Sequence, residues 1–318
     1  MQSSSTTRVT MPLAVSAALA VLTLSACGGS GQASATAGEA GSSSSAPAAA
    51  DPLPAADPTL AAMLPESVRS KGTITVAAAV YAPAVMVPEG GGTPTGWDVQ
   101  TTNEAAALLG LKVDYAIIPF DGVIPGLQAG RYDAATGEIN VTDERTQQVT
   151  FVVNHVSKDA VLLKSSAKQD SFASADDFCG LTIGAAIGST EAATADEIAK
   201  ECTGKGKDTK VSTFQTQALV NLAISQGRID ANIASGSQVA YSVDQSKGAF
   251  KLAEMGFGPQ IQAGLALPNN ADTAATAKAF AAATDKLIAD GRLQAILDEY
   301  NGGQGAVTQA EIVPAPAG

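Results

Sequence analysis

Residues 126–137, GLQAGRYDAATG, indicate how this chain folds, because the same pattern returns at residues 223–235 as AISQGRIDANIAS. Each copy has the end of a helix, a Gly-Arg pair, Tyr or Ile, an Asp, and then small residues typical of a buried strand. One Gly-Arg-x-Asp turn alone is a common connection between a helix and a strand. Two copies in the same context predict two similar α/β lobes.

The segments before the two copies alternate between strand and helix patterns. TITVAAAV (73–80) is typical of a buried strand, and GWDVQTTNEAAALLG (96–110) is typical of a helix that ends at its glycine. Before the second copy, LTIGAAIG (181–188) and TEAATADEIAKEC (190–202) repeat that order. Strands that alternate with helices predict mostly parallel sheets with helices on both faces.

The N-terminus has the pattern of an export signal over residues 1–26. The apolar run at residues 11–24 is too short for a comfortable membrane span, and it leads into LSAC, which ends at Cys27. That ending resembles the lipobox of bacterial lipoproteins, which implies cleavage before Cys27 and a lipid on its thiol. The alternative is an ordinary secreted protein with an incidental cysteine. Residues 27–67, rich in Gly, Ser, Ala and Pro, predict a flexible tether to the membrane.

Charge and composition exclude several kinds of site and partner. The net charge of -12 argues against nucleic acid as an electrostatic partner. The single histidine, His155, argues against His-rich metal sites, and the sequence predicts no catalytic residue, no metal and no cofactor. Cys179 and Cys202 lie in the exported part, where disulfides persist, so we expect them to form a bridge. The alternative is a pair of free buried thiols.

Several segments together resemble the family 3 extracellular solute-binding proteins, the amino-acid-type binding components of ABC importers. The resemblance covers residues 68–303. The segments that carry it are VYAPAV (80–85), TGWDVQTTNEAAALLGL (95–111), YDAATGEINVTDERTQQVTF (132–151), GLTIGAAIGSTE (180–191), QGRIDA (226–231) and IADGRLQAILDEY (288–300).

The resemblance implies a two-lobed α/β fold of the type II periplasmic-binding-protein kind, with two crossover strands as its hinge. Lobe 1 would comprise residues 68–158 plus 260–303, and lobe 2 residues 159–259. The ligand would sit between the lobes. Residues 304–318 are predicted to be a disordered tail.

The resemblance also implies the residues of a ligand site. Arg145 matches the arginine that pairs with a ligand carboxylate, and its planar fork suits that task. The alternative is an ion pair with Glu138, Asp143 or Glu144. Thr142 matches at the same spacing. The other positions implied to lie at the ligand are Tyr81, Phe120, Gly137, Glu138, Asn140, Ser189 and Thr190. Tyr81 and Phe120 could instead be core residues, and Ser189 or Thr190 a plain helix N-cap.

Two positions depart from the family pattern. Members that bind α-amino acids usually have an Asp five residues after the Asp of Gly-Arg-x-Asp, and here Ser235 stands there. Either Glu138 supplies the missing charge from the other lobe, or the ligand lacks an ordinary α-ammonium group. Members that bind basic amino acids often have an Asp at the position of Ala78, so a basic ligand side chain is not expected.

The function implied by the resemblance is delivery of a small carboxylate-bearing solute, an amino acid or derivative, to an ABC permease. The protein would be a monomer, anchored by lipid to the outer face of the cell membrane. A ligand-sensing lipoprotein that docks on a membrane receptor is one alternative. A cyclohexadienyl-dehydratase-like enzyme with Glu138 and Glu191 as acid and base is another.

Overall fold

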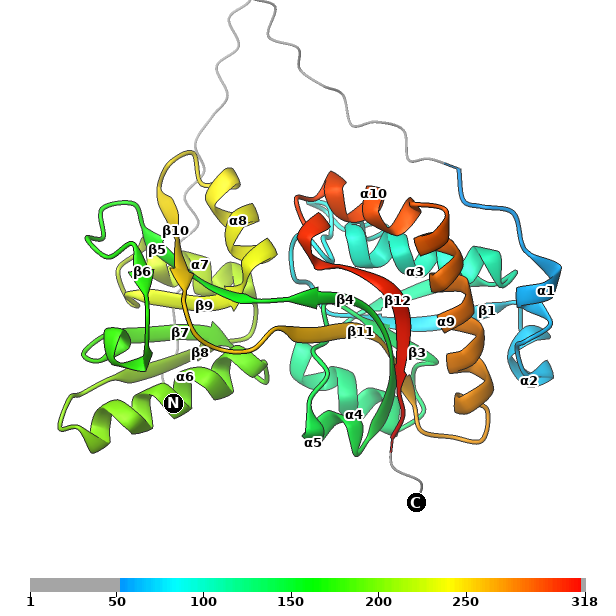
Figure 1. Cartoon of the computed structure of the whole chain (residues 1–318), viewed down its shortest axis with the longest axis horizontal. Helices are drawn as coiled ribbons and strands as arrows, with labels where there is room; N and C mark the ends of the chain where they lie inside the picture. The colour runs from blue at the N-terminus through cyan, green and yellow to red at the C-terminus, as the bar shows by residue number, and fades with distance from the viewer. Residues whose placement is uncertain (1–51, 316–318) are drawn as a thin grey trace, which may run out of the picture. The chain divides into compact units, whose positions relative to one another are not determined.

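The computed structural model describes residues 52–315, which form two lobes, each built on its own six-stranded sheet (Figure 1). The predicted signal peptide, Cys27 and most of the predicted tether lie outside the described residues. The elements of lobe 1 are α1 (Pro58–Ala61), α2 (Glu66–Arg69), β1 (Thr73–Ala78), α3 (Trp97–Leu108), β2 (Lys112–Ile117), η1 (Phe120–Gly122), α4 (Val123–Gln128), β3 (Ala134–Thr136), α5 (Asp143–Thr146), β4 (Val149–Ser157), β11 (Ile261–Pro268), α9 (Thr273–Ala289), α10 (Arg292–Glu299), η3 (Gly303–Gly305) and β12 (Ala306–Val313).

Lobe 2 is continuous in sequence and lies between β4 and β11. Its elements are β5 (Asp159–Lys164), β6 (Ser171–Phe172), η2 (Ala175–Phe178), β7 (Thr182–Ala186), α6 (Thr190–Gly204), β8 (Lys210–Phe214), α7 (Gln217–Ser225), β9 (Ala231–Ser235), α8 (Gly236–Gln245) and β10 (Phe250–Met255).

The two sheets have the same internal plan. Their strand orders are β12-β4-β11-β3-β1-β2 and β6-β10-β5-β9-β7-β8. In each sheet three strands are parallel, β3-β1-β2 in the first and β9-β7-β8 in the second, and two antiparallel pairings follow on one side. The edge strands differ, because β12 pairs antiparallel with β4 whereas β6 pairs parallel with β10. The chain passes between the sheets twice, from β4 to β5 and from β10 to β11 (Figure 1). These crossovers confirm the two-lobed type II fold.

The repeated Gly-Arg-x-Asp turn has the same structural role in both lobes. The Asp133 carboxylate accepts the N–H of Thr75 at 2.9 Å, and the Asp230 carboxylate accepts that of Thr182 at 2.8 Å. Each Asp therefore ties the start of its strand, β3 or β9, to the start of the central strand, β1 or β7. Gly130 caps the preceding helix end with a positive φ of 65°.

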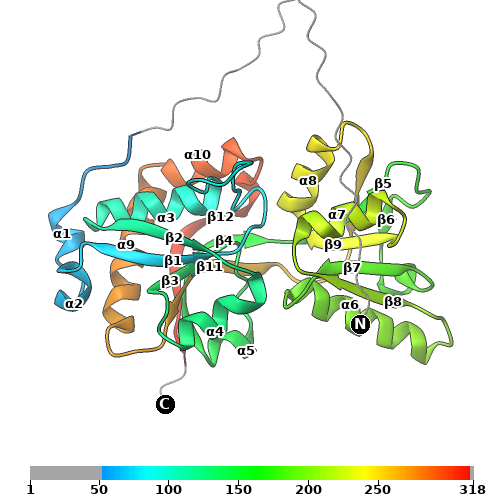
Figure 2. The same ribbon diagram turned by 180° about the vertical axis from the view of Figure 1, so that it is seen from behind.

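Helices cover both faces of each sheet, as the alternating pattern predicts. In lobe 1 the helices α3, α9 and α10 pack on one face and α4 on the other, which Figure 2 shows from behind. In lobe 2 the helix α6 packs on one face, and α7 and α8 on the other. Trp97 at the start of α3 is fully buried and its ring lies 4.6 Å from that of His155. Burial lowers the pKa of His155 to about 4.

The boundary of the predicted tether is wrong at its C-terminal end. Residues 57–67, expected to be flexible, contain the short helix α1 and the start of α2. The Asp57 side chain caps α1, its backbone N–H donates to Leu108 at 2.8 Å, and Leu64 is buried in the lobe 1 core. A few apolar contacts and a cap are enough to order this Ala- and Pro-rich segment against the lobe.

The predicted disordered tail is also wrong for most of its length. Residues Ala306–Val313 form β12, the edge strand of the lobe 1 sheet, paired antiparallel with β4. Ala310 is buried, and its N–H donates to Asp285 of α9 at 2.7 Å. The strand is ordered because β4 offers an open edge for its hydrogen bonds.

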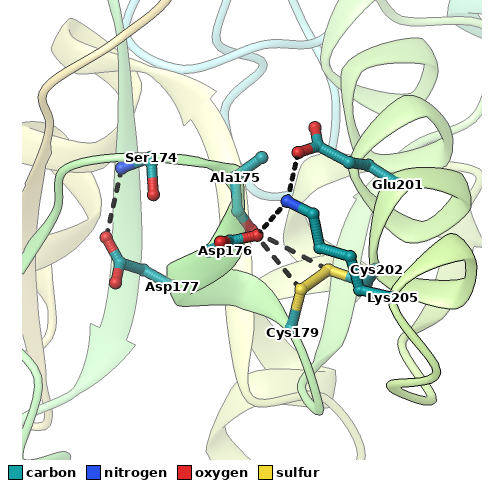
Figure 3. Close-up of polar contacts among 8 residues, drawn as sticks. All are labelled: Ser174, Ala175, Asp176, Asp177, Cys179, Glu201, Cys202 and Lys205. Atoms are coloured by element: carbon teal, nitrogen blue, oxygen red, sulfur yellow. Dashed lines mark hydrogen bonds and ion pairs between the residues drawn. A yellow bond between two sulfur atoms is a disulfide. The ribbon is translucent and has the colours of Figure 1, made fainter.

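Cys179 and Cys202 form the expected disulfide, with Cα atoms 5.3 Å apart (Figure 3). It joins the end of η2 to the last turn of α6. Both sulfurs lie near the carbonyl of Ala175, and Lys205 forms ion pairs with Asp176 and Glu201 beside them. Those ion pairs are exposed and contribute little to stability.

Residues 52–315 contain no helix that is long and apolar enough to cross a membrane. In the same range no cluster of three or more His, Cys, Asp or Glu side chains is placed to hold a metal ion.

Candidate ligand-binding site

A cavity of about 250 Å³ lies between the lobes. Its walls come from the C-terminal ends of the parallel strands β1, β2 and β3 in lobe 1 and β7 and β8 in lobe 2, where open α/β sheets bind ligands. The lining residues are Val80, Tyr81, Ile117, Ile118, Pro119, Phe120, Gly137, Glu138, Asn140, Ala186, Ser189, Thr190, Glu191, Gln215, Thr216 and Gln217.

The turn after β3 presents Glu138 to the cavity. Gly137 has a φ of 129°, and a Cβ there would lie 2.8 Å from the carbonyl oxygen of Ala79, so only glycine fits. Glu138 itself has a positive φ of 52°. The buried carboxylate of Asp98 accepts the backbone N–H groups of both residues at 2.8 Å. Asp98 thus holds the turn in a conformation that is unfavourable for a non-glycine residue.

Glu138 is 5% exposed, and its carboxylate oxygens have few hydrogen-bond partners. Its Oε2 accepts a long 3.4 Å hydrogen bond from Ser237, and its Oε1 has no hydrogen-bond partner. The pKa of this carboxyl is raised to about 8, mainly by burial and also by the charges of Glu191 and Asp98, while the hydroxyls of Ser235 and Ser237 oppose the rise. Within the fold Glu138 therefore favours the protonated form.

Arg145 lies beside the cavity and is not among the residues that line it. Its guanidinium donates to the carbonyls of Asn140 at 2.8 Å and Gly188 at 3.1 Å, and lies 5.2 Å from the ring centroid of Phe120. No ion pair joins it to an acid within residues 52–315. Burial lowers the pKa of Arg145, and the charges of Glu191 and Glu144 oppose that.

The first turn of α6 forms the lobe 2 wall. Ser189 is its N-cap, with its hydroxyl accepting the N–H of Ala192 at 3.1 Å. Thr190 accepts a 2.6 Å hydrogen bond from the Asn140 amide, which joins the two lobes. Glu191 follows and is buried against the cavity. The N-cap interpretation of Ser189 holds here, and it leaves the turn available to a ligand as well.

Tyr81 makes a second connection between the lobes. Its hydroxyl accepts the backbone N–H of Ser235 at 3.0 Å and donates to the Ser235 hydroxyl at 3.3 Å. Burial, together with the charges of Glu191 and Glu138, raises the pKa of Tyr81 well above its ordinary value. Ser235 is buried, caps α8 with its hydroxyl, and does not line the cavity.

The structure brings most of the predicted site residues to one cavity. Three of them stand behind its wall, namely Thr142, Arg145 and Ser235. Thr142 caps α5 by accepting the N–H of Arg145 at 3.1 Å, so it positions that residue. Residues that line the cavity and were not assigned to it from the sequence include Val80, Ile117, Ile118 and Gln215–Gln217, and Glu191, considered only for the enzyme alternative, lines it as well. Their place at the carboxyl ends of β1, β2, β7 and β8 is the signal that would have found them.

Comparisons with known proteins agree with this architecture. The family model for bacterial extracellular solute-binding proteins, family 3, matches residues 74–303. The probable amino-acid-binding protein YxeM of Bacillus subtilis (strain 168) is 27% identical over 210 residues, which are 65% of this chain and 75% of that protein.

Solved structures are similar over nearly their whole length. An ancestral arginine-binding protein bound to arginine has a TM-score of 0.65 and 25% identity, covering 73% of this chain and 99% of the other. The ancestral amino acid-binding protein AncCDT-1, a precursor of cyclohexadienyl dehydratase, has a TM-score of 0.63 and 22% identity, covering 76% and 99%, a likeness of fold alone. The family expected from the sequence is confirmed, and the chain belongs to the bacterial extracellular solute-binding proteins, family 3.

Proposed function

We propose that this protein binds a small carboxylate-bearing solute, an amino acid or a derivative of one, and delivers it to an ABC importer. The observation that carries the proposal is the cavity between the lobes, because both lobes supply its walls and a ligand there would hold them together. The likeness to YxeM, a probable amino-acid-binding protein, supports the class of solute. Closure around the ligand would form the surface that a permease recognises.

The ligand carboxylate would bind at Arg145 and at the N-terminus of α6. Arg145 donates two hydrogen bonds to backbone carbonyls, and a guanidinium has five N–H groups to offer. The first turn of α6 carries free backbone N–H groups that favour an anion. Tyr81 and Phe120 would pack on the apolar part of the ligand, and Gly137, Glu138 and Asn140 would line its polar end.

Membrane attachment is the second part of the proposal. The LSAC sequence ending at Cys27 supports cleavage before that residue and a lipid on its thiol, with the protein at the outer face of the cell membrane. Radiolabelled palmitate should enter the protein and should not enter the Cys27→Ser variant. Equal labelling of both, or of neither, would reject the anchor.

Two other functions compete with transport. A ligand sensor would use the same cavity and tether, and ligand uptake that persists in cells lacking this protein would favour it. An enzyme of the dehydratase kind would use Glu138 and Glu191, which both line the cavity, as acid and base. Conversion of a bound ligand by the purified protein would favour the enzyme.

The central test is ligand binding by wild-type protein and by Arg145→Ala. A thermal-shift screen of amino acids, 2-oxo acids and amino-acid derivatives identifies the ligand, and calorimetry then gives its affinity. Loss of two or more charge-assisted hydrogen bonds should weaken binding by at least about tenfold. Arg131→Ala, which removes an exposed arginine of the Gly-Arg-x-Asp turn, is the matched control. Unchanged affinity in Arg145→Ala would overturn the role of Arg145, and hits only among sugars or metals would overturn the site.

A further inference from the structure

Two carboxylates face the cavity from opposite lobes, and no Lys, Arg or His is among its described lining residues. Glu138 belongs to the turn after β3, and Glu191 to the first turn of α6. The two side chains are 5% and 6% exposed. The rest of the polar lining consists of amides and hydroxyls, which carry no charge. The cavity is therefore an acidic site with apolar walls.

The Glu138 carboxyl is not needed to satisfy any described backbone group. Asp98, directly behind it, already accepts both N–H groups of the turn. Glu138 Oε1 has no partner, and the only described groups that hydrogen-bond the carboxyl are serine hydroxyls, that of Ser237 at 3.4 Å from Oε2 and that of Ser235. A buried carboxyl with an empty oxygen costs stability, so its presence at a cavity wall indicates a missing partner.

Arg145 does not serve as that partner. Its two recorded hydrogen bonds go to backbone carbonyls, and the face of its guanidinium lies over Phe120. Its positive charge acts on Glu191 and Glu144, and no such interaction with Glu138 is recorded among the described residues. The charge of Glu138 is thus left for a group that enters the cavity.

We propose that Glu138 and Glu191 together bind a cationic nitrogen of the ligand, each from its own lobe. This inference rests on the proposed function and narrows it, because it requires an amine and excludes 2-oxo acids. It also explains why Ser235 can stand where the family usually has an Asp. Glu138 and Glu191 would supply the negative charge that the Asp supplies in those members. A nitrogen shared between the lobes would favour the closed form over the open one.

A proton takes the place of that nitrogen when the cavity is empty. The groups that face Glu138 are Asp98 from α3, Glu191 from α6, and the neutral side chains of Tyr81, Ser235 and Ser237. None of these is a cation, so the proton is the available counter-charge, in keeping with a pKa of about 8. Entry of a cationic nitrogen should expel the proton. Affinity should then rise by up to about tenfold per pH unit below pH 8 and become constant above it.

The first experiment compares three matched series by calorimetry on the full-length protein. These are the amino acids, their 2-oxo acids such as 4-methyl-2-oxopentanoate for leucine, and their carboxyl-free amines such as isopentylamine. The binding amino acid should bind at least about tenfold more tightly than its 2-oxo acid. Equal affinity of the two would overturn this inference and leave the proposed function standing. Binding of the amine alone would support the cation site at Glu138 and Glu191 and would reject a carboxylate-bearing solute. If no compound of the three series bound, both the cation site and the proposed function would be rejected.

The second experiment tests the two residues with the amino acid found in the first. Glu138→Gln and Glu191→Gln should each lose at least about tenfold in affinity. Glu197→Gln, an exposed acid on the same helix as Glu191, should bind as wild type does. Titration in phosphate and in Tris at neutral pH should reveal a proton released on binding, and Glu138→Gln should release none. Unchanged affinity in Glu191→Gln, which does not touch the strained turn, would overturn the proposal even if Glu138→Gln failed to fold.

Discussion

The turn at Gly137 and Glu138 depends on a residue that does not line the cavity. Asp98 reaches it from the first turn of α3 and is itself 1% exposed. One of its oxygens, Oδ2, accepts two backbone N–H groups, while Oδ1 has no partner. Glu138 keeps its positive φ because the two hydrogen bonds to the Asp98 carboxylate hold the backbone of the turn in that conformation. Asp98 is a positioning residue for the proposed site.

Replacement of Asp98 should destabilise the whole of lobe 1. In Asp98→Ala the two buried N–H groups lose their acceptor, so the free energy of unfolding should fall by about 3 kcal/mol. Urea unfolding followed by circular dichroism measures this. Asp114→Ala, at an exposed position of β2, is the control and should change the free energy by less than about 0.5 kcal/mol. If Asp98→Ala also changed the free energy of unfolding by less than about 0.5 kcal/mol, the turn at Gly137 and Glu138 would be stable without the Asp98 carboxylate.

Glu138 should make the ligand-free protein less stable as the pH rises. Its pKa is about 8 in the folded chain against an ordinary 4.5, so between these values the folded state binds more protons than the unfolded state. Stability conferred by the protonated carboxyl is full below the lower value and is lost as the pH rises toward 8.

Comparison with Glu138→Gln isolates this effect, because Asp159, whose pKa is raised to about 7, contributes a slope of the same sign. The difference in unfolding free energy, wild type minus variant, should fall between about pH 5 and pH 8, by at most about 1.4 kcal/mol per pH unit. A difference that is constant over that range would mean that Glu138 has an ordinary pKa.

Sequence alone predicted which residues gather at the cavity better than it predicted what each one does there. Gly137, Glu138 and Asn140 were expected at the site because the segment around them resembles the family pattern, and in the structure all three line the cavity. The partners of Arg145 could not be predicted. They are backbone carbonyls, one of which, Gly188, belongs to the other lobe, and every residue offers a carbonyl, so no pattern marks the one that is used.

At the scale of elements, the long periodic segments were predictable and the short ones were not. Strands β1 and β7 and helices α3 and α6 have a strong pattern of their own. The strand β12 has the sequence AVTQAEIV, in which Thr, Gln and Glu interrupt the apolar residues, and it exists because β4 offers it an edge. The helix α1 has only four residues and is held by a cap and by contact with the core. Tertiary contacts, which lie far away in sequence, decide such elements.

Helix α6 connects the disulfide with the proposed site. Its N-cap Ser189 and its first two residues, Thr190 and Glu191, line the cavity. Its last turn carries Cys202 (Figure 3). Cys179, at the end of η2, fixes that last turn to the lobe 2 core. The bridge thus constrains the far end of the helix whose near end would clamp the ligand.

The double variant Cys179→Ser, Cys202→Ser should fold into the same structure with lower stability. The bridge closes a loop of about 24 residues, so its loss should cost roughly 3 kcal/mol in the free energy of unfolding. Because α6 stays packed through Ala195 and Ile198, ligand affinity should change by less than about threefold. Chemical unfolding and calorimetry measure the two quantities. A large loss of affinity in a fully folded variant would show that the bridge also positions the site.

At the scale of the whole molecule, polar contacts around the cavity connect the two lobes within residues 52–315. They include Asn140 to Thr190, Arg145 to Gly188, Tyr81 to Ser235, and Ser237 to Glu138. Each joins one residue of lobe 1 to one of lobe 2, and the crossovers β4–β5 and β10–β11 are the covalent connections. Since the hinge is covalent, these contacts and the ligand determine how long the lobes stay together.

The Tyr81 hydroxyl is the contact whose loss is easiest to interpret, because it serves a backbone group. In Tyr81→Phe the buried N–H of Ser235 loses its acceptor, and opening the lobes would let water replace it. The ligand-free variant should therefore have a larger radius of gyration in X-ray scattering than wild type, and saturating ligand should restore the compact value. Because closure then costs about 1–2 kcal/mol more, affinity should fall by about 5- to 30-fold.

Tyr132→Phe is the control, since the Tyr132 ring packs on Gly126 within lobe 1 and makes no recorded contact with lobe 2 among the described residues. It should scatter and bind as wild type does. If Tyr81→Phe also scattered and bound as wild type does, the Tyr81 hydroxyl would not contribute to closure of the lobes. The contacts of Asn140 and Arg145, together with Glu138 and Glu191, would then have to keep the lobes closed. If the variant opened and still bound with full affinity, closure would not be coupled to binding. The proposal that ligand-bound lobes form the surface read by a permease would then lose its physical basis.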